Sequence, residues 1–167
     1  MNLYKTWSRG FDKNREIGFY GDMKERSIFL NLSPLDHRYY LSNKEVFDSL
    51  ALYLSEEAGI RYCLKAEIAL LKALVSFQTD LPDKETLLAS LEGLEEKMTP
   101  EEVYEEEEKT QHNIRSLVNV IKRKIPEEIT HLVHLGATSM DILDTANSCR
   151  IRDAVRKVVL PLLCQVE

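Results

Sequence analysis

Beyond residue 43, apolar side chains recur every three or four positions along most of the chain, which is the spacing of amphipathic helices. Neither the alternating pattern of strands nor an Asn-Gly hairpin turn occurs. The predicted helices share the helical period and cover residues 43–54, 56–77, 83–91, 100–124 and 138–167. We therefore predict an all-α fold.

Local signals mark where these helices begin. Ser42 with Glu45, and Thr99 with Glu102, have the S/T-x-x-E form of a capping box, in which side chains at a helix start bond to free backbone N–H groups. Ser55 is placed to cap the second helix. These signals predict helix starts near residues 43, 56 and 100.

Other residues predict interruptions. We expect the helix over 100–124 to be kinked near Gln111 and to end before Pro126, and we expect Pro161 to kink the last helix. The last helix carries two apolar stripes, namely Ile151, Val155, Val158 and Leu162, and beside them Val159, Leu163 and Val166. A helix that is apolar over so much of its circumference belongs to a bundle. We therefore expect either that the chain associates with itself through residues 142–166 or that this segment is poorly ordered.

The composition narrows the functional class. A hydrophobic content of 44% and a charged content of 30% are ordinary for a globular protein, and the net charge of −6 argues against a nucleic-acid surface. No apolar run is long enough to span a membrane, and the N-terminus lacks the apolar core of a signal peptide. Three widely spaced cysteines suit a reducing compartment, and no Cys/His group has zinc spacing. We expect a cytoplasmic protein that holds no metal or cofactor.

The stretch from His134 to Asp144 carries the strongest candidate chemistry. Gly136 gives the local backbone conformational freedom. Thr138 with Asp141 has the S/T-x-x-D form of a helix start, so Thr138 and Ser139 should lie at a helix N-terminus. The free N–H groups and the positive dipole end there suit a carboxylate or phosphate. On local physics alone, an ordinary helix cap explains the same residues.

Two further blocks contain residues that bind anions or polar ligands. Arg38 and Tyr39 follow a loop-like segment, and an arginine fork with a tyrosine hydroxyl suits phosphate, although a surface ion pair and a core aromatic are the ordinary alternatives. His112 lies between Gln111 and Asn113, and its ordinary alternative is a hydrogen-bonded histidine on a buried helix face.

Taken in order and spacing, the blocks Ser33 to Tyr39, Thr110 to Ile114 and His134 to Asp144 resemble the adenylosuccinate lyase family of the fumarase/aspartase superfamily. The resemblance implies a phosphate-binding Arg-Tyr pair, a substrate-contacting histidine and a substrate-binding Gly-Ala-Thr-Ser loop. Gln111 and Asn113 depart from the arginine and aspartate that the family usually has beside this histidine. The residues with an implied substrate-binding role are Arg38, Tyr39, Gln111, His112, Asn113, Thr138 and Ser139.

The same resemblance implies what the protein does. Members of the adenylosuccinate lyase family eliminate fumarate from adenylosuccinate, giving AMP, and from the succinyl-carboxamide ribotide of purine synthesis. They are homotetramers, and each active site draws residues from three subunits. Residues 1–32 would be an arm, 33–137 the N-terminal helical domain and 138–167 the start of the central bundle. The catalytic acid and base of the superfamily would lie beyond residue 167, so this segment would bind a purine nucleotide without moving protons.

Two alternatives remain open at this point. A carboxymuconate cycloisomerase of the same superfamily has a similar Gly-Ala-Thr-Ser-x-Asp loop, but its substrate carries no phosphate for Arg38 and Tyr39 to bind. A helical interaction module without activity is the alternative from another class.

Overall fold

The computed structural model describes Leu32 and residues 39–166. The predicted arm, apart from Leu32, and Arg38 lie outside the described residues. Every regular element of the described part is a helix, which confirms the all-α fold. No described helix combines the length and the apolar character that crossing a membrane requires.

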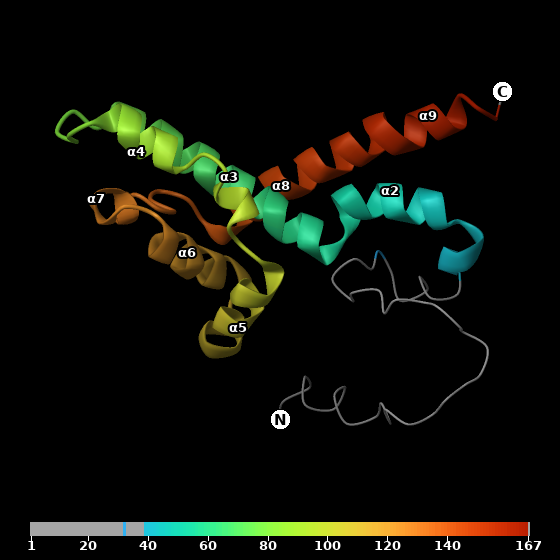
Figure 1. The fold of residues 1–167 in the computed structure, drawn as a ribbon, viewed down its shortest axis with the longest axis horizontal. Coiled ribbons are helices and arrows are strands. Elements are labelled where there is room, and N and C mark those ends of the chain that lie inside the picture. The colour runs from blue at the N-terminus through green and yellow to red at the C-terminus, as the bar shows by residue number, and fades with distance from the viewer. Residues whose placement is uncertain (1–31, 33–38, 167) are drawn as a thin grey trace.

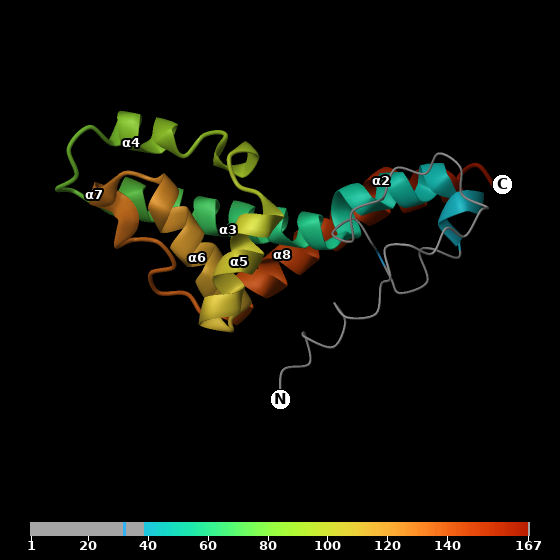
Figure 2. The same cartoon turned by 60° about the horizontal axis from the view of Figure 1, so that its bottom comes forward.

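The helix α3 (Glu56–Phe77) is the longest described helix and runs through the middle of the fold (Figure 1). In Figure 2, α4 lies on one side of α3, and α5, α6 and α8 lie on the other. The remaining elements, in chain order, are η3 (Tyr40–Ser42), α2 (Lys44–Leu54), α4 (Lys84–Ser90), η4 (Leu94–Glu96), α5 (Pro100–Thr110), α6 (Asn113–Lys124), α7 (Glu127–Thr130), α8 (Ser139–Ala154), η5 (Val155–Val159) and α9 (Leu160–Leu163).

The core forms around the apolar face of α3. Leu64, Ile68, Leu71 and Val75 repeat at helical spacing and are all buried. They pack with buried residues of the other elements, among them Leu94, Val103, Leu117, Ile121, Ile129, Leu132, Ile142 and Ala146. The first turns of α8 therefore share this core with α3 and α6, and the start of α8 is held in place by packing from both.

Most of the predicted helix starts are confirmed. Ser55 Oγ accepts a hydrogen bond from Ala58 N at 3.1 Å, and Thr99 and Glu102 form the reciprocal capping box. The predicted box of Ser42 and Glu45 is wrong. Ser42 already belongs to the turn η3, so Asn43 takes the cap position and its side chain makes no cap bond.

The predicted kink near Gln111 is a complete break between α5 and α6. Gln111 has a left-handed backbone, with φ of 54°, and His112 has an extended backbone, so the α-helix cannot continue through them. The segment between the predicted helices over 100–124 and 138–167 contains the short helix α7. Both differences follow from local backbone geometry that the apolar pattern does not record.

The end of α8 accommodates Pro161 by a wide turn. Proline lacks an N–H, and in a regular helix its ring would meet the carbonyl four residues earlier. Here η5 is a π turn in which Leu160 N donates to Val155 O, and α8 and α9 run on as one rod (Figure 1). The two predicted stripes do not match the exposed and buried residues of this rod. Val158 is buried, and the exposed large apolar residues are Ile151, Val155, Val159, Leu160, Leu163 and Val166.

Candidate functional site

The starts of α6 and α8 meet at His112 and Ser139. His112 is the cap residue of α6, and its Nδ1 accepts a hydrogen bond from Arg115 N at 3.2 Å. Its Nε2 lies 3.4 Å from Ser139 Oγ, the first residue of α8. Two predicted residues that are 27 positions apart in the sequence are therefore neighbours at the junction of two helix N-termini.

The cap bond determines the form of the His112 ring. A nitrogen that accepts a hydrogen bond has a free lone pair, so Nδ1 carries no proton while it caps α6. The neutral ring then carries its proton on Nε2, the nitrogen beside Ser139. His112 is exposed, so this polar edge is accessible to a ligand at the junction. The arrangement presents hydrogen-bond donors where helix dipoles already favour negative charge.

Thr138 is the cap residue at the start of α8. The carboxylate of Asp141 accepts hydrogen bonds from Thr138 N at 2.8 Å and from Thr138 Oγ1 at 3.2 Å. The predicted pairing of Thr138 with Asp141 is confirmed. Because the Thr138 hydroxyl donates to Asp141, it retains its lone pairs but has no hydrogen left to offer a ligand. Of the two hydroxyls at this helix start, Ser139 is the one that lies toward His112.

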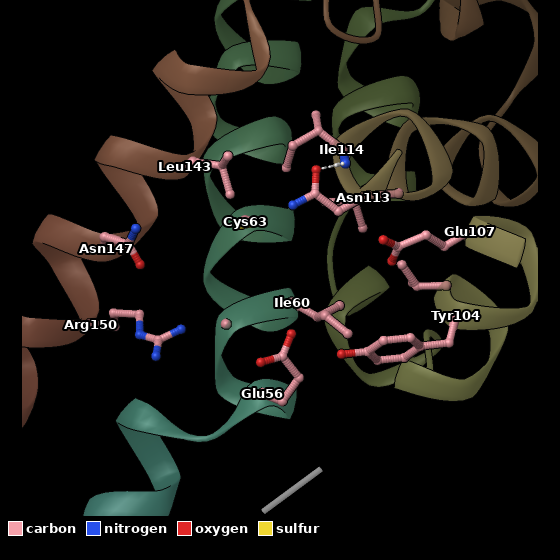
Figure 3. A pocket seen from close by; sticks show the side chains of 13 residues that line it. Glu56, Ile60, Cys63, Tyr104, Glu107, Asn113, Ile114, Leu143, Asn147 and Arg150 are labelled. Carbon is pink, nitrogen blue, oxygen red and sulfur yellow. Dashed lines mark hydrogen bonds between the residues drawn. The ribbon is translucent and has the colours of Figure 1, made fainter. Parts of the chain in front are cut away.

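The side chains of the two residues beside His112 make contacts away from Ser139. Gln111 Nε2 donates to Glu108 O at 2.8 Å, which closes the end of α5. Asn113 Oδ1 accepts from Ile114 N at 2.7 Å, and Figure 3 shows this side chain beside a cavity between α3, α5, α6 and α8. The structure thus brings His112 and Ser139 together but directs Gln111 and Asn113 to other contacts.

The cavity beside Asn113 is not large enough for a nucleotide. Its volume is about 120 Å³, whereas pockets for drug-sized ligands are roughly 300–1,000 Å³. Cys63 and Arg150 are among the residues that line it, and burial raises the pKa of the Cys63 thiol to about 11, so this thiol is unreactive at neutral pH. The Arg150 Nη2 donates to Leu54 O at 2.9 Å, so the guanidinium joins α8 to the end of α2. We read the cavity as a packing feature.

Tyr39 lies far from the junction of His112 and Ser139. Arg150 marks the point where α8 meets the end of α2, and Ser139 lies about 16 Å before it along α8. From that same point α2 runs about 16 Å in the direction of α9, and Tyr39 precedes its start (Figure 1). Tyr39 and Ser139 of one chain therefore cannot contact the same small ligand.

Comparison with known proteins identifies the family. A protein of Buchnera aphidicola named adenylosuccinate lyase is 32% identical over 144 residues, which are 78% of this chain and 30% of that protein. Adenylosuccinate lyases of Archaeoglobus fulgidus and Dictyostelium discoideum are 33% and 29% identical over 74% and 80% of this chain, and over 25% and 31% of their own lengths.

No family model matches the chain, and no solved structure matches it significantly. The chain belongs to the adenylosuccinate lyase family. It spans between a quarter and a third of the length of these relatives, so it corresponds to a segment of such a lyase. The resemblance expected from the three sequence blocks is confirmed, and the cycloisomerase and the interaction module are not favoured.

One buried polar residue escaped the sequence reasoning. Glu67, on α3, is 1% exposed, and its Oε1 lies 2.6 Å from His134 Nδ1 in the loop before Thr138. The signal was present, because position 67 falls between Leu64 and Ile68 on the apolar face of α3, where a charged residue is unusual. A glutamate at such a position needs a partner, and His134 in the loop before α8 is that partner.

Proposed function

We propose that this chain is the substrate-binding part of an adenylosuccinate lyase that eliminates fumarate from adenylosuccinate and from the succinyl-carboxamide ribotide of purine synthesis. In this reaction a base removes a proton next to a carboxylate, and an acid protonates the leaving nitrogen. Both catalytic groups would lie outside these 167 residues, so the chain alone would release no fumarate. The setting would be the cytoplasm, where purine nucleotides are made.

The observation that carries the proposal is the contact between His112 and Ser139 at two helix starts. The succinyl group of the proposed substrate has two carboxylates, and helix N-termini with neutral donors bind carboxylates without a full positive charge nearby. Within the described residues, this junction joins two of the sequence blocks that resemble the family. His112 and Ser139 are thus assigned to the succinyl end of the substrate, with Thr138 supporting the loop.

Arg38 and Tyr39 are assigned to the phosphate of the nucleotide. The distance of Tyr39 from Ser139 in one chain supports an active site assembled from more than one subunit, since both ends of one substrate would need these groups. The exposed apolar face of α8 and α9 is a suitable surface for such assembly. We propose a homotetramer, as the family resemblance implies.

The test compares two serines on α8 in the complete lyase. Ser139→Ala should lower kcat/KM for adenylosuccinate about 10- to 100-fold, because a hydrogen bond to a charged group contributes roughly 1.5–3 kcal/mol. Ser148→Ala, on an exposed turn of the same helix, is the matched control and should leave kcat/KM unchanged. Equal values for wild type and Ser139→Ala would reduce Ser139 to a helix-start residue and remove the basis of the proposal.

A further inference from the structure

Glu67 is a buried carboxyl group in the middle of the fold. It is one of only four buried polar or charged residues in the described part of the chain. Its Oε1 contacts His134 Nδ1, and its Oε2 is the single buried side-chain oxygen or nitrogen in that part without a hydrogen-bond partner. Native structures leave few such atoms unpaired, so a carboxyl group at this position is unusual.

The position is energetically unfavourable for a carboxylate by itself. Burial raises the pKa of Glu67, and the attraction and hydrogen bond of His134 oppose that rise. A leucine would fill the same space at the apolar face of α3 without any such cost. What Glu67 adds is a fixed acceptor aimed at one nitrogen of His134.

The histidine that receives this contact has an unusual backbone. His134 has φ of 64°, a left-handed conformation that costs roughly 1–2 kcal/mol for a residue with a side chain. Gly136, with φ of 78°, follows, and Thr138 and Ser139 begin α8 directly afterwards. Contacts of the surrounding structure must hold such a conformation in place, and the side-chain contact that His134 makes within the described residues is the hydrogen bond with Glu67.

We propose that Glu67 is a positioning residue: its carboxylate accepts a hydrogen bond from His134 Nδ1, fixes the ring, and so holds the loop of residues 134–138 that brings Ser139 to His112. The inference rests on the proposed function for its effect on catalysis. An ionised carboxylate can only accept a hydrogen bond, so in this arrangement Nδ1 is the donor and carries the proton. This leaves Nε2 of His134 without a proton in the neutral ring, and the side chain is partly exposed.

The first test is spectroscopic and uses the 167-residue chain. In protein with ¹⁵N-labelled histidine, the His134 ring, assigned with a His134→Asn variant, should show its proton on Nδ1. Glu67→Gln keeps an acceptor oxygen and should preserve this form, whereas Glu67→Leu should lose it. Glu106→Leu is the control, because Glu106 is a buried carboxylate bonded to Asn119 and Arg123 on another part of the fold. A wild-type His134 with its proton on Nε2 would overturn the proposal even if Glu67→Leu does not fold.

The second test measures catalysis in the complete lyase. Glu67→Leu should lower kcat/KM about 10- to 100-fold, since a misplaced binding group has effects of this size, and Glu67→Gln should recover most of the loss. Full activity in a Glu67→Leu enzyme would overturn the positioning role. A wild-type protein without lyase activity would instead refute the proposed function, and the ring measurement would still decide whether Glu67 orients His134.

Discussion

Replacing Ile151 with glutamate should dissociate copies of the chain that associate through α8 and α9. The exposed face of this rod carries a row of apolar side chains that nothing in the described part of the chain covers. Their exposed fractions run from 37% to 85%, and the residues are Ile151, Val155, Val159, Leu160, Leu163 and Val166. Monomeric proteins rarely leave a continuous apolar patch of this kind in water.

The expected free energy of association follows from the exposed fractions of these side chains. Complete burial of a Val, Leu or Ile side chain contributes about 1.5–3 kcal/mol, so side chains that are about half exposed retain about 1 kcal/mol each. Two copies of this row of six side chains therefore offer about 12 kcal/mol, against an association cost of roughly 4–15 kcal/mol. With a cost in the lower part of that range, roughly 4–8 kcal/mol, the net is weak association with Kd in the micromolar to millimolar range.

Sedimentation velocity over a range of concentrations measures this association. Ile151→Glu acts twice in a symmetric pair and should weaken it by about 30-fold or more, because each copy loses about 1 kcal/mol of burial and gains a charge. Phe77→Glu is the control, since Phe77 is also a large exposed apolar residue but lies at the end of α3, away from α9. Val158→Glu is not a suitable probe, because Val158 is buried and the change would disturb the fold. A folded wild-type chain that stays monomeric at millimolar concentration would refute the reasoning.

Three further predictions concern stability. Leu71→Ala, at a site 1% exposed, should lower the free energy of unfolding by about 2–5 kcal/mol in urea titrations, because the cavity adds to the lost burial. Hydrogen bonds from Asn119 and Arg123 lower the pKa of Glu106 from its ordinary 4.5 to about 2. The stabilisation from this carboxylate is therefore complete above about pH 4.5 and is lost as the pH falls toward 2. Urea titrations across this range should show a smaller decline for Glu106→Gln than for wild type, and equal slopes would contradict the assignment. Thr99→Ala should remove the capping box of α5 and cost about 1 kcal/mol, with faster amide exchange in the first turn of α5 as the local check.

The sequence allowed the elements with strong local signals to be predicted. The second predicted helix has the observed bounds of α3, because an unbroken apolar period begins at a good cap, Ser55, and stops at a polar turn. An interruption near Gln111 was predicted, but only as a kink, since glutamine is a good helix former and gives no signal for the left-handed backbone that breaks the helix. The π turn was missed for a similar reason: proline indicates a disturbance, but not which form the helix takes to relieve it.

The candidate site was predicted by residue but not by arrangement. His112 and Ser139 were both named from the sequence, yet their contact depends on how α6 packs against α8, which no local pattern encodes. The direction of Asn113 toward the cavity and the distance of Tyr39 are likewise results of tertiary packing. Glu67 was missed because the apolar pattern of α3 was read without asking why one charged residue lies among the apolar ones. That residue is buried and therefore needed a partner.

The wide turn before Pro161 has a mechanical consequence. Because it keeps α8 and α9 in one rod of about 37 Å, Ser139 at one end and the exposed apolar row toward the other are parts of the same stiff element. A hinge at the proline would have let the two ends move separately. Without one, any neighbour that fixes the apolar row also fixes the direction in which Ser139 is presented. Association through the apolar row would then influence the geometry of the loop before α8, over a distance that no single side chain could bridge.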